Sequence, residues 1–386
     1  MLKILYTVIE SAPNICNYLS NLGKIIPNRA IFLSIIMRAL PKARMPEMPS
    51  LTLEDIAKQA GVSRSTVSRV VNNHPNISEG VRTRVLNVIH ETGYQPNAAA
   101  RSLASQRTQT IGLVLPQAVS SFFTDPYFPR LIQGISEACN QRDYVLALFL
   151  ISSKEDERNI FSKVSNRSFL DGVLVQSGHH GDQQIIGRLV DAKIPQVVLG
   201  RPYRDDNVSF VNVDNVGGAY TAVSHLIRLG RRRIATITGP LESTVGVDRK
   251  QGYLQALNER GIGSDSDIMI EGDFTEQGGY YAMQTLLHQN PDAVFAASDV
   301  MAIGAIRAIQ ESGRRIPDDV AVVGFDDLPL STIREFEVTT IRQPVFQTGV
   351  RAVEVLIDQL RNGIGFPQHI ILDTKLVVRS SCGNNA

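Results

Sequence analysis

Residues 52–72 read TLEDIAKQAGVSRSTVSRVVN, and this stretch sets the interpretation of the whole chain. Its pattern predicts two short amphipathic helices joined by a turn at residues 60–62. Thr52 is a typical N-cap, because Asp55 can return a hydrogen bond to the backbone of the capping residue. Gly61 supplies the backbone freedom that the turn requires. The stretch therefore predicts a DNA-contacting helix-turn-helix; the alternative is a small helical hairpin without that role.

The second of these helices separates apolar and polar residues onto different faces. Ser63 is expected to cap it, while its valines point inward. Hydroxyl and arginine side chains on the other face can reach base edges and phosphates from a helix in the major groove. The predicted DNA contacts of this segment are Thr52, Ser63, Arg64, Ser65, Thr66, Ser68, Arg69 and Asn72.

A third helix is predicted after Ser78, with Gly93 as its C-terminal stop. The following residues 97–104 read NAAARSLA, a run with high helix propensity. Because this run is only about two turns long, it is marginally stable as an isolated helix.

Residues 51–103 together resemble the DNA-binding head of the LacI/GalR family of bacterial transcriptional regulators. The resemblance implies a three-helix head, a hinge helix that folds on DNA and pairs with its twin in a dimer, and a large effector-binding domain. It also implies that Leu103 enters the minor groove and bends the duplex, with Asn97 and Arg101 as DNA contacts in the same segment. An ordinary linker helix with Leu103 packed on the body is the alternative.

Charge is distributed unevenly along the 386 residues. Residues 51–107 hold seven Lys and Arg against four Asp and Glu, and residues 1–50 hold six against two. The rest of the chain therefore carries a net charge of −6 within a total of +1. A basic head on an acidic body suits a phosphate-facing module attached to a sensing domain, although ordinary charge fluctuation would also allow it.

The first 50 residues lack the periodicity of a folded domain, and their apolar runs are too short to span a bilayer. Polar residues interrupt any signal-peptide core, so export is not expected. Because the head of the resembled family usually begins its chain, translation is expected to start at Met45 or Met48. Otherwise residues 1–50 form a poorly ordered tail.

The cysteines Cys16, Cys139 and Cys382 show none of the paired spacing of a zinc site or a disulfide framework. His179 and His180 are adjacent but have no partner cluster, so neither a metal site nor another cofactor is predicted. Free cysteines suit a reducing compartment. We therefore expect the protein in the cytoplasm, at the nucleoid.

From residue 108 onward, short apolar runs alternate with helical patterns, as in repeated strand–helix units. The predicted strands are residues 111–115, 145–150, 172–176, 196–199, 234–238, 268–271, 293–297, 320–325 and 370–378. Helices are predicted at residues 127–141, 217–229, 246–260, 277–288 and 300–313. Helical crossovers of this length predict parallel sheets, and the length of the region predicts two doubly wound α/β subdomains with a cleft between them.

Ligands of such sheets bind at the carboxyl ends of strands, so the residues that follow the predicted strands nominate a site. They are Tyr127, Phe128, Arg201, Arg249, Phe274 and Asp299. The resemblance implies that Arg249 and Asp299 hold hydroxyls or polar ring groups of an effector and that Phe274 stacks on it. An arginine fork and a carboxylate suit vicinal hydroxyls. Structural ion pairs, caps or packing are the alternatives for these residues.

The sequence thus predicts an α+β multidomain chain with a head at residues 51–96, a hinge at 97–107 and an effector-binding and dimerisation domain at 108–386. The predicted function is a homodimeric transcriptional regulator, most simply a repressor, that binds operator DNA and responds to a sugar. No heptad helix follows the last predicted strand, which favours a dimer over a tetramer. A purine-responsive regulator, an exported sugar-binding protein and a sugar-processing enzyme are the rivals. No nucleophile with a matched base supports the enzyme, since adjacent residues such as Asp326 and Asp327 rarely face the same way.

Overall fold

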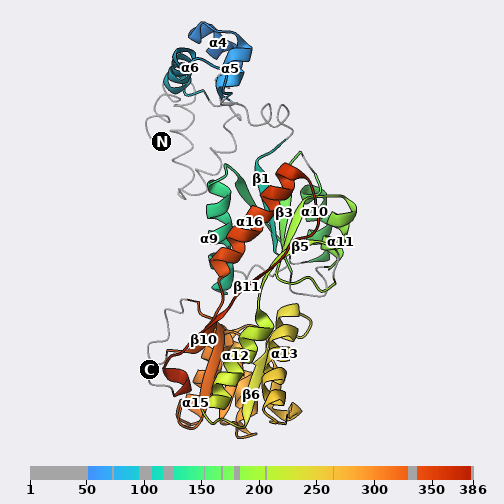
Figure 1. Cartoon of the computed structure of the whole chain (residues 1–386), viewed down its shortest axis with the longest axis vertical. Helices are drawn as coiled ribbons and strands as arrows, with labels where there is room; N and C mark the ends of the chain where they lie inside the picture. The colour runs from blue at the N-terminus through green and yellow to red at the C-terminus, as the bar shows by residue number, and fades with distance from the viewer. Residues whose placement is uncertain are drawn as a thin grey trace, which may run out of the picture. The chain divides into compact units, whose positions relative to one another are not determined.

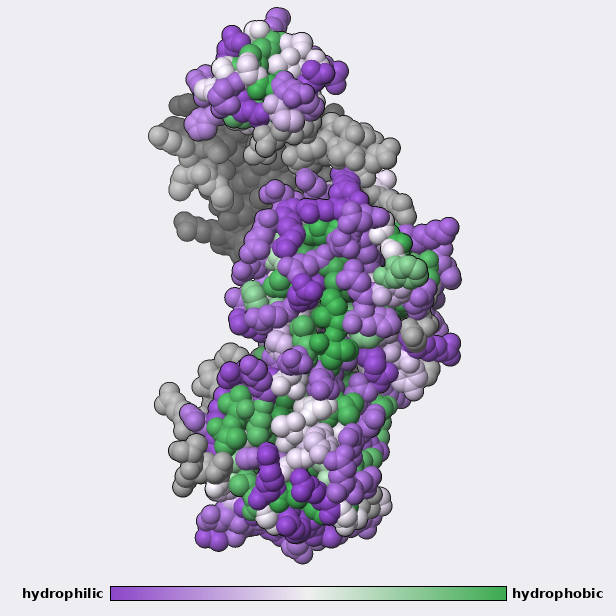
Figure 2. All heavy atoms as spheres, viewed as in Figure 1, coloured by the Kyte–Doolittle hydropathy of each residue, from purple (hydrophilic) through white to green (hydrophobic). Residues whose placement is uncertain are grey.

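A computed structural model describes residues 51–71, 74–94, 107–115, 125–151, 153–166, 168–177, 183–204, 207–263, 265–328 and 337–383. Predictions for the first 50 residues and for Asn72, Asn97, Arg101 and Leu103 lie outside these ranges. The chain divides after residue 96 into two compact units. On the visible face of each unit, hydrophilic side chains predominate and apolar ones form smaller groups (Figure 2). Among the described residues, no helix is long and apolar enough to cross a membrane.

The first unit contains the helices α4 (Leu53–Ala60), α5 (Arg64–Val71) and α6 (Glu79–Thr92) (Figure 1). The predicted capping box is present: the Asp55 N–H donates to Thr52 Oγ1, and the Thr52 N–H donates to the Asp55 carboxylate at 2.9 Å. Gly61 ends α4 in the left-handed conformation, with φ 63°. Ser63 caps α5 by accepting from the Thr66 N–H at 3.2 Å. These local predictions are confirmed.

Apolar residues from all three helices form one small core in this unit. Val67 and Val70 are buried on α5, as predicted, and pack with buried residues of α4 and α6. The buried members of the core are Ile56, Ala57, Ala60, Val67, Val70, Val85 and Tyr94. Ser78 stands at the N-cap of α6, but its side chain makes no capping hydrogen bond. The polar face of α5 is left for solvent because its valines are used in this core.

The second unit contains two six-stranded sheets. The first sheet has the order β11-β5-β4-β3-β1-β2, and all of its pairs are parallel. Its strands are β1 (Thr110–Leu115), β2 (Val145–Leu150), β3 (Gly172–Gln176), β4 (Gln196–Leu199), β5 (Ser209–Val213) and β11 (His369–Leu372). The second has the order β12-β10-β9-β8-β6-β7, and only β12 is antiparallel to its neighbour. Its strands are β6 (Ile234–Thr238), β7 (Met269–Glu271), β8 (Ala293–Ala296), β9 (Ala321–Asp326), β10 (Thr339–Arg342) and β12 (Lys375–Val377).

Helices cover both faces of each sheet, so each sheet is the centre of a doubly wound lobe, as predicted (Figure 1). In the first lobe α9 (Tyr127–Asn140) packs with α16 (Val345–Asn362) on one face, and α10 (Lys154–Val164) and α11 (Gln183–Asp191) cover the other. In the second lobe α12 (Asn215–Arg228) pairs with α13 (Thr244–Glu259), and α14 (Glu276–Leu287) with α15 (Asp299–Glu311). The short 3-10 helices are η2 (Ser266–Ile268) and η3 (Ser380–Cys382).

The chain passes between the lobes three times, at β5–α12, β10–α16 and β11–β12. The single strand predicted at residues 370–378 is wrong, because residues 373–374 carry the chain from one sheet to the other and divide it into β11 and β12. Strand β5 was not predicted, since Ser209 and Asn212 interrupt its apolar pattern. Both residues are nevertheless buried.

Candidate functional site

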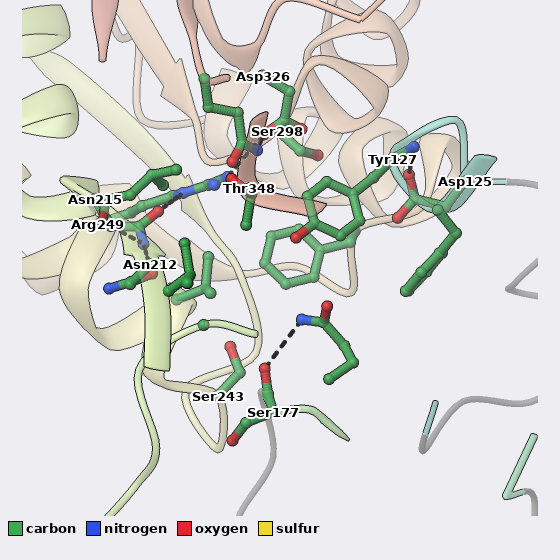
Figure 3. A pocket seen from close by; sticks show the side chains of 18 of the residues that line it. Asp125, Tyr127, Ser177, Asn212, Asn215, Ser243, Arg249, Ser298, Asp326 and Thr348 are labelled. Atoms are coloured by element: carbon green, nitrogen blue, oxygen red, sulfur yellow. Dashed lines mark hydrogen bonds and ion pairs between the residues drawn. The ribbon is translucent and has the colours of Figure 1, made fainter. Parts of the chain in front are cut away.

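A cleft lies between the two lobes, at the carboxyl ends of their strands (Figure 3). It holds about 940 Å³ of space with its open mouth included. The lining residues are Asp125, Tyr127, Phe128, Gln176, Ser177, Gly200, Val211, Asn212, Val213, Asn215, Ser243, Val245, Arg249, Phe274, Ser298, Val300, Asp326, Gln343 and Thr348. A doubly wound fold binds its ligand at this position.

Arg249 forms the polar centre of the cleft, and Figure 3 shows it connected to Asn215 and Asp326. Its Nε donates to Asn215 Oδ1 at 2.9 Å, and its Nη1 donates to the Ala297 carbonyl and to Asp326 Oδ1, the latter at 3.3 Å. The guanidinium carbon lies 3.6 Å from the ring centre of Phe325. Burial lowers the pKa of Arg249, and the nearby Asp326 carboxylate opposes that shift. These partners allow a guanidinium to remain charged inside the protein.

Asp326 is the carboxylate that faces Arg249. It ends β9 with φ 124°, a backbone conformation that L-residues rarely adopt and that tends to occur at functional sites. Burial raises the pKa of Asp326 to about 7, although Arg249 acts to lower it. The adjacent Asp327 points elsewhere and pairs with Arg342 at 2.6 Å. The two neighbouring carboxylates therefore do not form an acid pair, as expected from their adjacency.

Aromatic side chains form the apolar wall of the cleft. Tyr127 and Phe128 begin α9 and contact each other edge to face, with ring centres 5.4 Å apart. Phe274, in the other lobe, has a left-handed backbone with φ 61°. Its ring lies over Gly239, where an added Cβ would be only 2.2 Å from the ring. These rings offer faces on which the C–H groups of a ligand can pack.

Two residues that were predicted to bind the effector do not line the cleft. Arg201 donates to the Asp248 carboxylate through Nη2 at 2.6 Å and through Nε at 3.2 Å, so it joins the two lobes. Asp299 is buried, and its carboxylate accepts hydrogen bonds from the Thr340 hydroxyl and, at 2.7 Å, from the Asp327 N–H. In this structure both side chains form structural ion pairs or hydrogen bonds, which was the alternative interpretation for them, because protein groups bond to their polar atoms. An effector contact by either one stays a prediction.

Sequence reasoning missed much of the polar wall. Asn212 and Asn215 flank the end of the unpredicted strand β5, and Asn215 Nδ2 donates to Asn212 Oδ1 at 3.2 Å. Gln176 and Ser177 follow a predicted strand, so the strand-end rule would have found them. The Ser177 hydroxyl is buried and has no hydrogen-bond partner among the described residues. Buried hydroxyls without a partner are uncommon, and this one belongs to a residue of the cleft wall.

The predicted DNA-contacting face of α5 is open to solvent. Ser63, Arg64, Ser65 and Arg69 are exposed, as is Thr52, while Thr66 and Ser68 are partly buried. Arg64 Nη1 lies 3.0 Å from the Glu54 carboxylate, and the two side chains are 68% and 58% exposed. Such an exposed ion pair contributes little to stability, so a phosphate can replace Glu54 at low cost. The face thus combines exposed guanidinium groups with hydroxyl groups, of which those of Ser63, Ser65 and Thr66 hydrogen-bond to one another.

Comparison with known proteins finds a matching protein family for each of the two units. Residues 52–97 match the family of bacterial regulatory proteins named lacI, and residues 223–382 match a periplasmic binding protein-like domain. The transcriptional regulator CelR of Thermobifida fusca is 39% identical over 334 residues, which cover 86% of this chain and 98% of CelR. The chain belongs to the LacI family. The repressor PurR of Photorhabdus laumondii, also a LacI-family protein, is 35% identical over 86% of this chain and 96% of its own length.

Solved LacI-family structures agree with the observed architecture. The structure of CelR with cellobiose has a TM-score of 0.68 and 37% identity, and covers 86% of this chain and 99% of its own. The lac repressor dimer bound to operator and the anti-inducer ONPF has a TM-score of 0.74 and 27% identity, with the same coverage. This LacI-family chain is therefore a DNA-binding transcriptional regulator.

Proposed function

We propose that the protein is a homodimeric repressor whose two heads bind the halves of a palindromic operator, and that a sugar in the cleft controls this binding. Residues 51–96 would form the head, 97–107 the hinge and 108–386 the effector-binding and dimerisation domain. The observation that carries the proposal is the buried Arg249–Asp326 pair, set between aromatic walls in the cleft of a LacI-family chain. As a regulator of transcription, the protein would act in the cytoplasm, at the nucleoid.

The polar wall supports a sugar as the effector. Gln176 and Asn212 offer amide groups, and Ser177 offers a buried hydroxyl without a described partner. Hydroxyl-rich ligands need several such donors and acceptors, and their rings have apolar C–H faces that pack on aromatic rings. Tyr127 and Phe274 supply such rings from opposite lobes. The solved complex of CelR with cellobiose makes this disaccharide the first sugar to test.

The open edge of the first sheet supports a dimer. β2 pairs with β1 and lies at the end of the strand order. Val145 and Leu148 on this strand are 64% and 45% exposed. An apolar edge strand is a surface that proteins usually cover, and a second copy of the chain would cover it here. We expect Leu148→Asp to convert a dimer into a monomer in sedimentation velocity; an unchanged sedimentation coefficient would place the interface elsewhere.

Control by the effector would operate through the two lobes. A sugar that contacts both walls binds one lobe arrangement better than another, and it shifts the population by the ratio of those affinities. The DNA-competent arrangement would thereby lose population. This mechanism needs binding and no turnover, so cellobiose incubated with the protein should be recovered unchanged; accumulation of glucose would support the enzyme hypothesis instead.

The proposal is tested with the full chain and an operator selected from random duplexes. Cellobiose should raise the melting temperature of the protein and release the selected duplex in a gel shift. Guanine serves as the purine probe, since the aromatic walls would also accept a planar base. Stabilisation by guanine and not by cellobiose would favour the purine-responsive alternative. A chain that selects no duplex would contradict the DNA-binding part of the proposal.

A further inference from the structure

Acidic side chains outnumber basic ones around the cleft. Asp125 and Asp326 both line it. Burial raises the pKa of Asp299, and the nearby Asp326 carboxylate raises it further. Arg249 is the one cationic side chain among the described lining residues. The lining therefore has two carboxyl groups, those of Asp125 and Asp326, against one guanidinium; burial raises the pKa of both carboxyls, and Arg249 acts to lower both.

The positive charge of Arg249 is already used within the protein. Its Nε and Nη1 donate to Asn215, to the Ala297 carbonyl and to Asp326. Asp326 also accepts a hydrogen bond from the Gln343 side chain. A ligand anion would have to compete with Asp326 for the same guanidinium, at a site where both groups are buried. Removing a partner from a buried charge is costly, so the pair is not readily exchanged.

Helix N-termini, which often bind phosphate, are also occupied around this cleft. At α13 the Ser243 hydroxyl accepts from the Gly246 N–H at 3.0 Å, and at α15 the Ser298 hydroxyl accepts from the Met301 N–H at 3.2 Å. At α9 the Asp125 carboxylate accepts from the Tyr127 N–H at 2.9 Å. Side-chain oxygens thus fill positions that a phosphate oxygen would take, and the oxygen at α9 belongs to a carboxyl group.

We infer that the cleft selects a neutral sugar against the same sugar carrying a phosphate, and that Asp125 and Asp326 impose this selection. The inference rests on the proposed sugar effector and specifies its charge. The uncharged amides and hydroxyls of the wall can satisfy sugar hydroxyls in either case. A phosphate adds about −1.5 to −2 charges, which the carboxylates repel across a partly desolvated space.

The test compares sugar pairs by titration calorimetry on the full-length protein. The pairs are cellobiose with cellobiose 6′-phosphate, and glucose with glucose 6-phosphate. The phosphorylated member should bind weaker by on the order of a hundredfold. In Asp125→Asn this ratio should fall by about tenfold, because the amide removes the charge while its oxygen can still accept from the Tyr127 N–H.

Asp191→Asn is the matched control, because Asp191 is exposed at the end of α11 and this variant changes the net charge equally. It should leave the ratio unchanged. Equal or tighter binding of a phosphorylated sugar would overturn the inference. A ratio that Asp125→Asn leaves unchanged, or that both variants change equally, would overturn the role of the cleft carboxylates while the proposed function stands. If no sugar of either kind binds, the proposed function fails and the inference fails with it.

Discussion

The head and the cleft between the lobes each contain an arginine–carboxylate pair, but the two pairs differ in how far their charges are exposed to solvent. On the head, the side chains of Arg64 and Glu54 are 68% and 58% exposed. In the cleft, those of Arg249 and Asp326 are 5% and 9% exposed. An exposed pair contributes about 0–1 kcal/mol, whereas breaking a buried pair costs roughly 3–5 kcal/mol. The head is therefore suited to exchanging partners with DNA, and the cleft to holding a fixed geometry around a ligand.

The largest expected effect comes from removing the buried cation. Arg249→Met should lower the free energy of unfolding by about 3 kcal/mol, because it leaves Asp326 without its partner. Sugar binding should fall below detection in calorimetry. Urea denaturation measures the first effect, and Arg351→Met, on the exposed surface of α16, is the control. Wild-type sugar affinity in Arg249→Met would show that the cleft is not the effector site.

A second large effect is expected on the head, without a matching loss of stability. Arg69→Ala should weaken binding to the selected operator by about 1–3 kcal/mol, because Arg69 is exposed on the face of α5 proposed to enter the major groove. Sugar binding should not change. Arg84→Ala, exposed on α6, provides the control in the same gel shift. Equal losses in the two variants would indicate a general charge effect and not a specific contact.

The buried carboxylate of Asp326 should also make the free energy of unfolding depend on pH. Burial raises the pKa of Asp326 to about 7 in the folded chain, despite Arg249. A carboxyl with a raised folded pKa favours folding when it is protonated, so its contribution to stability is lost as pH rises toward 7. The free energy of unfolding of Asp326→Asn, relative to wild type, should therefore increase between pH 4.5 and about pH 7.5. A constant difference across that interval would show that Asp326 titrates normally.

Arg201→Met tests a pair of intermediate exposure, since the Arg201 side chain is 40% exposed and that of Asp248 is 9% exposed. We expect a loss of about 1 kcal/mol in unfolding free energy, between the values for the exposed and buried pairs. Urea denaturation at low and high salt provides the measurement. A loss as large as that of Arg249→Met would show that exposure is not what separates the two kinds of pair.

The smallest effect is expected for Glu54→Gln, which breaks the exposed pair on the head. Stability should change by less than about 1 kcal/mol. Operator binding should become slightly tighter, because a carboxylate beside Arg64 is removed from a surface proposed to face phosphates. Weaker operator binding in the gel shift would mean that Glu54 positions Arg64, and that the head too depends on a fixed pair.

The sequence by itself determined the head and the class of fold. Thr52, Asp55 and Gly61 act on neighbours within a few residues, so their roles are visible in the order of the letters. Strands such as β2, β3 and β6 were predicted with their observed bounds, since continuous apolar runs are a local signal. The position of the cleft followed from the rule that ligands bind at the ends of parallel strands.

Only the tertiary structure decided which side chains face the cleft. Arg249 meets Asp326 across 77 residues of chain and Asn215 across 34, and no local pattern encodes such pairings. The same long-range packing directs Arg201 to Asp248 and Asp299 to Thr340, so two residues at the ends of predicted strands are held by protein partners. The exposed face of α5 forms wherever an amphipathic helix buries its apolar side in a core, so the local sequence is enough to predict it. A buried charged site needs every partner in place, because an unpaired charge inside the protein is costly.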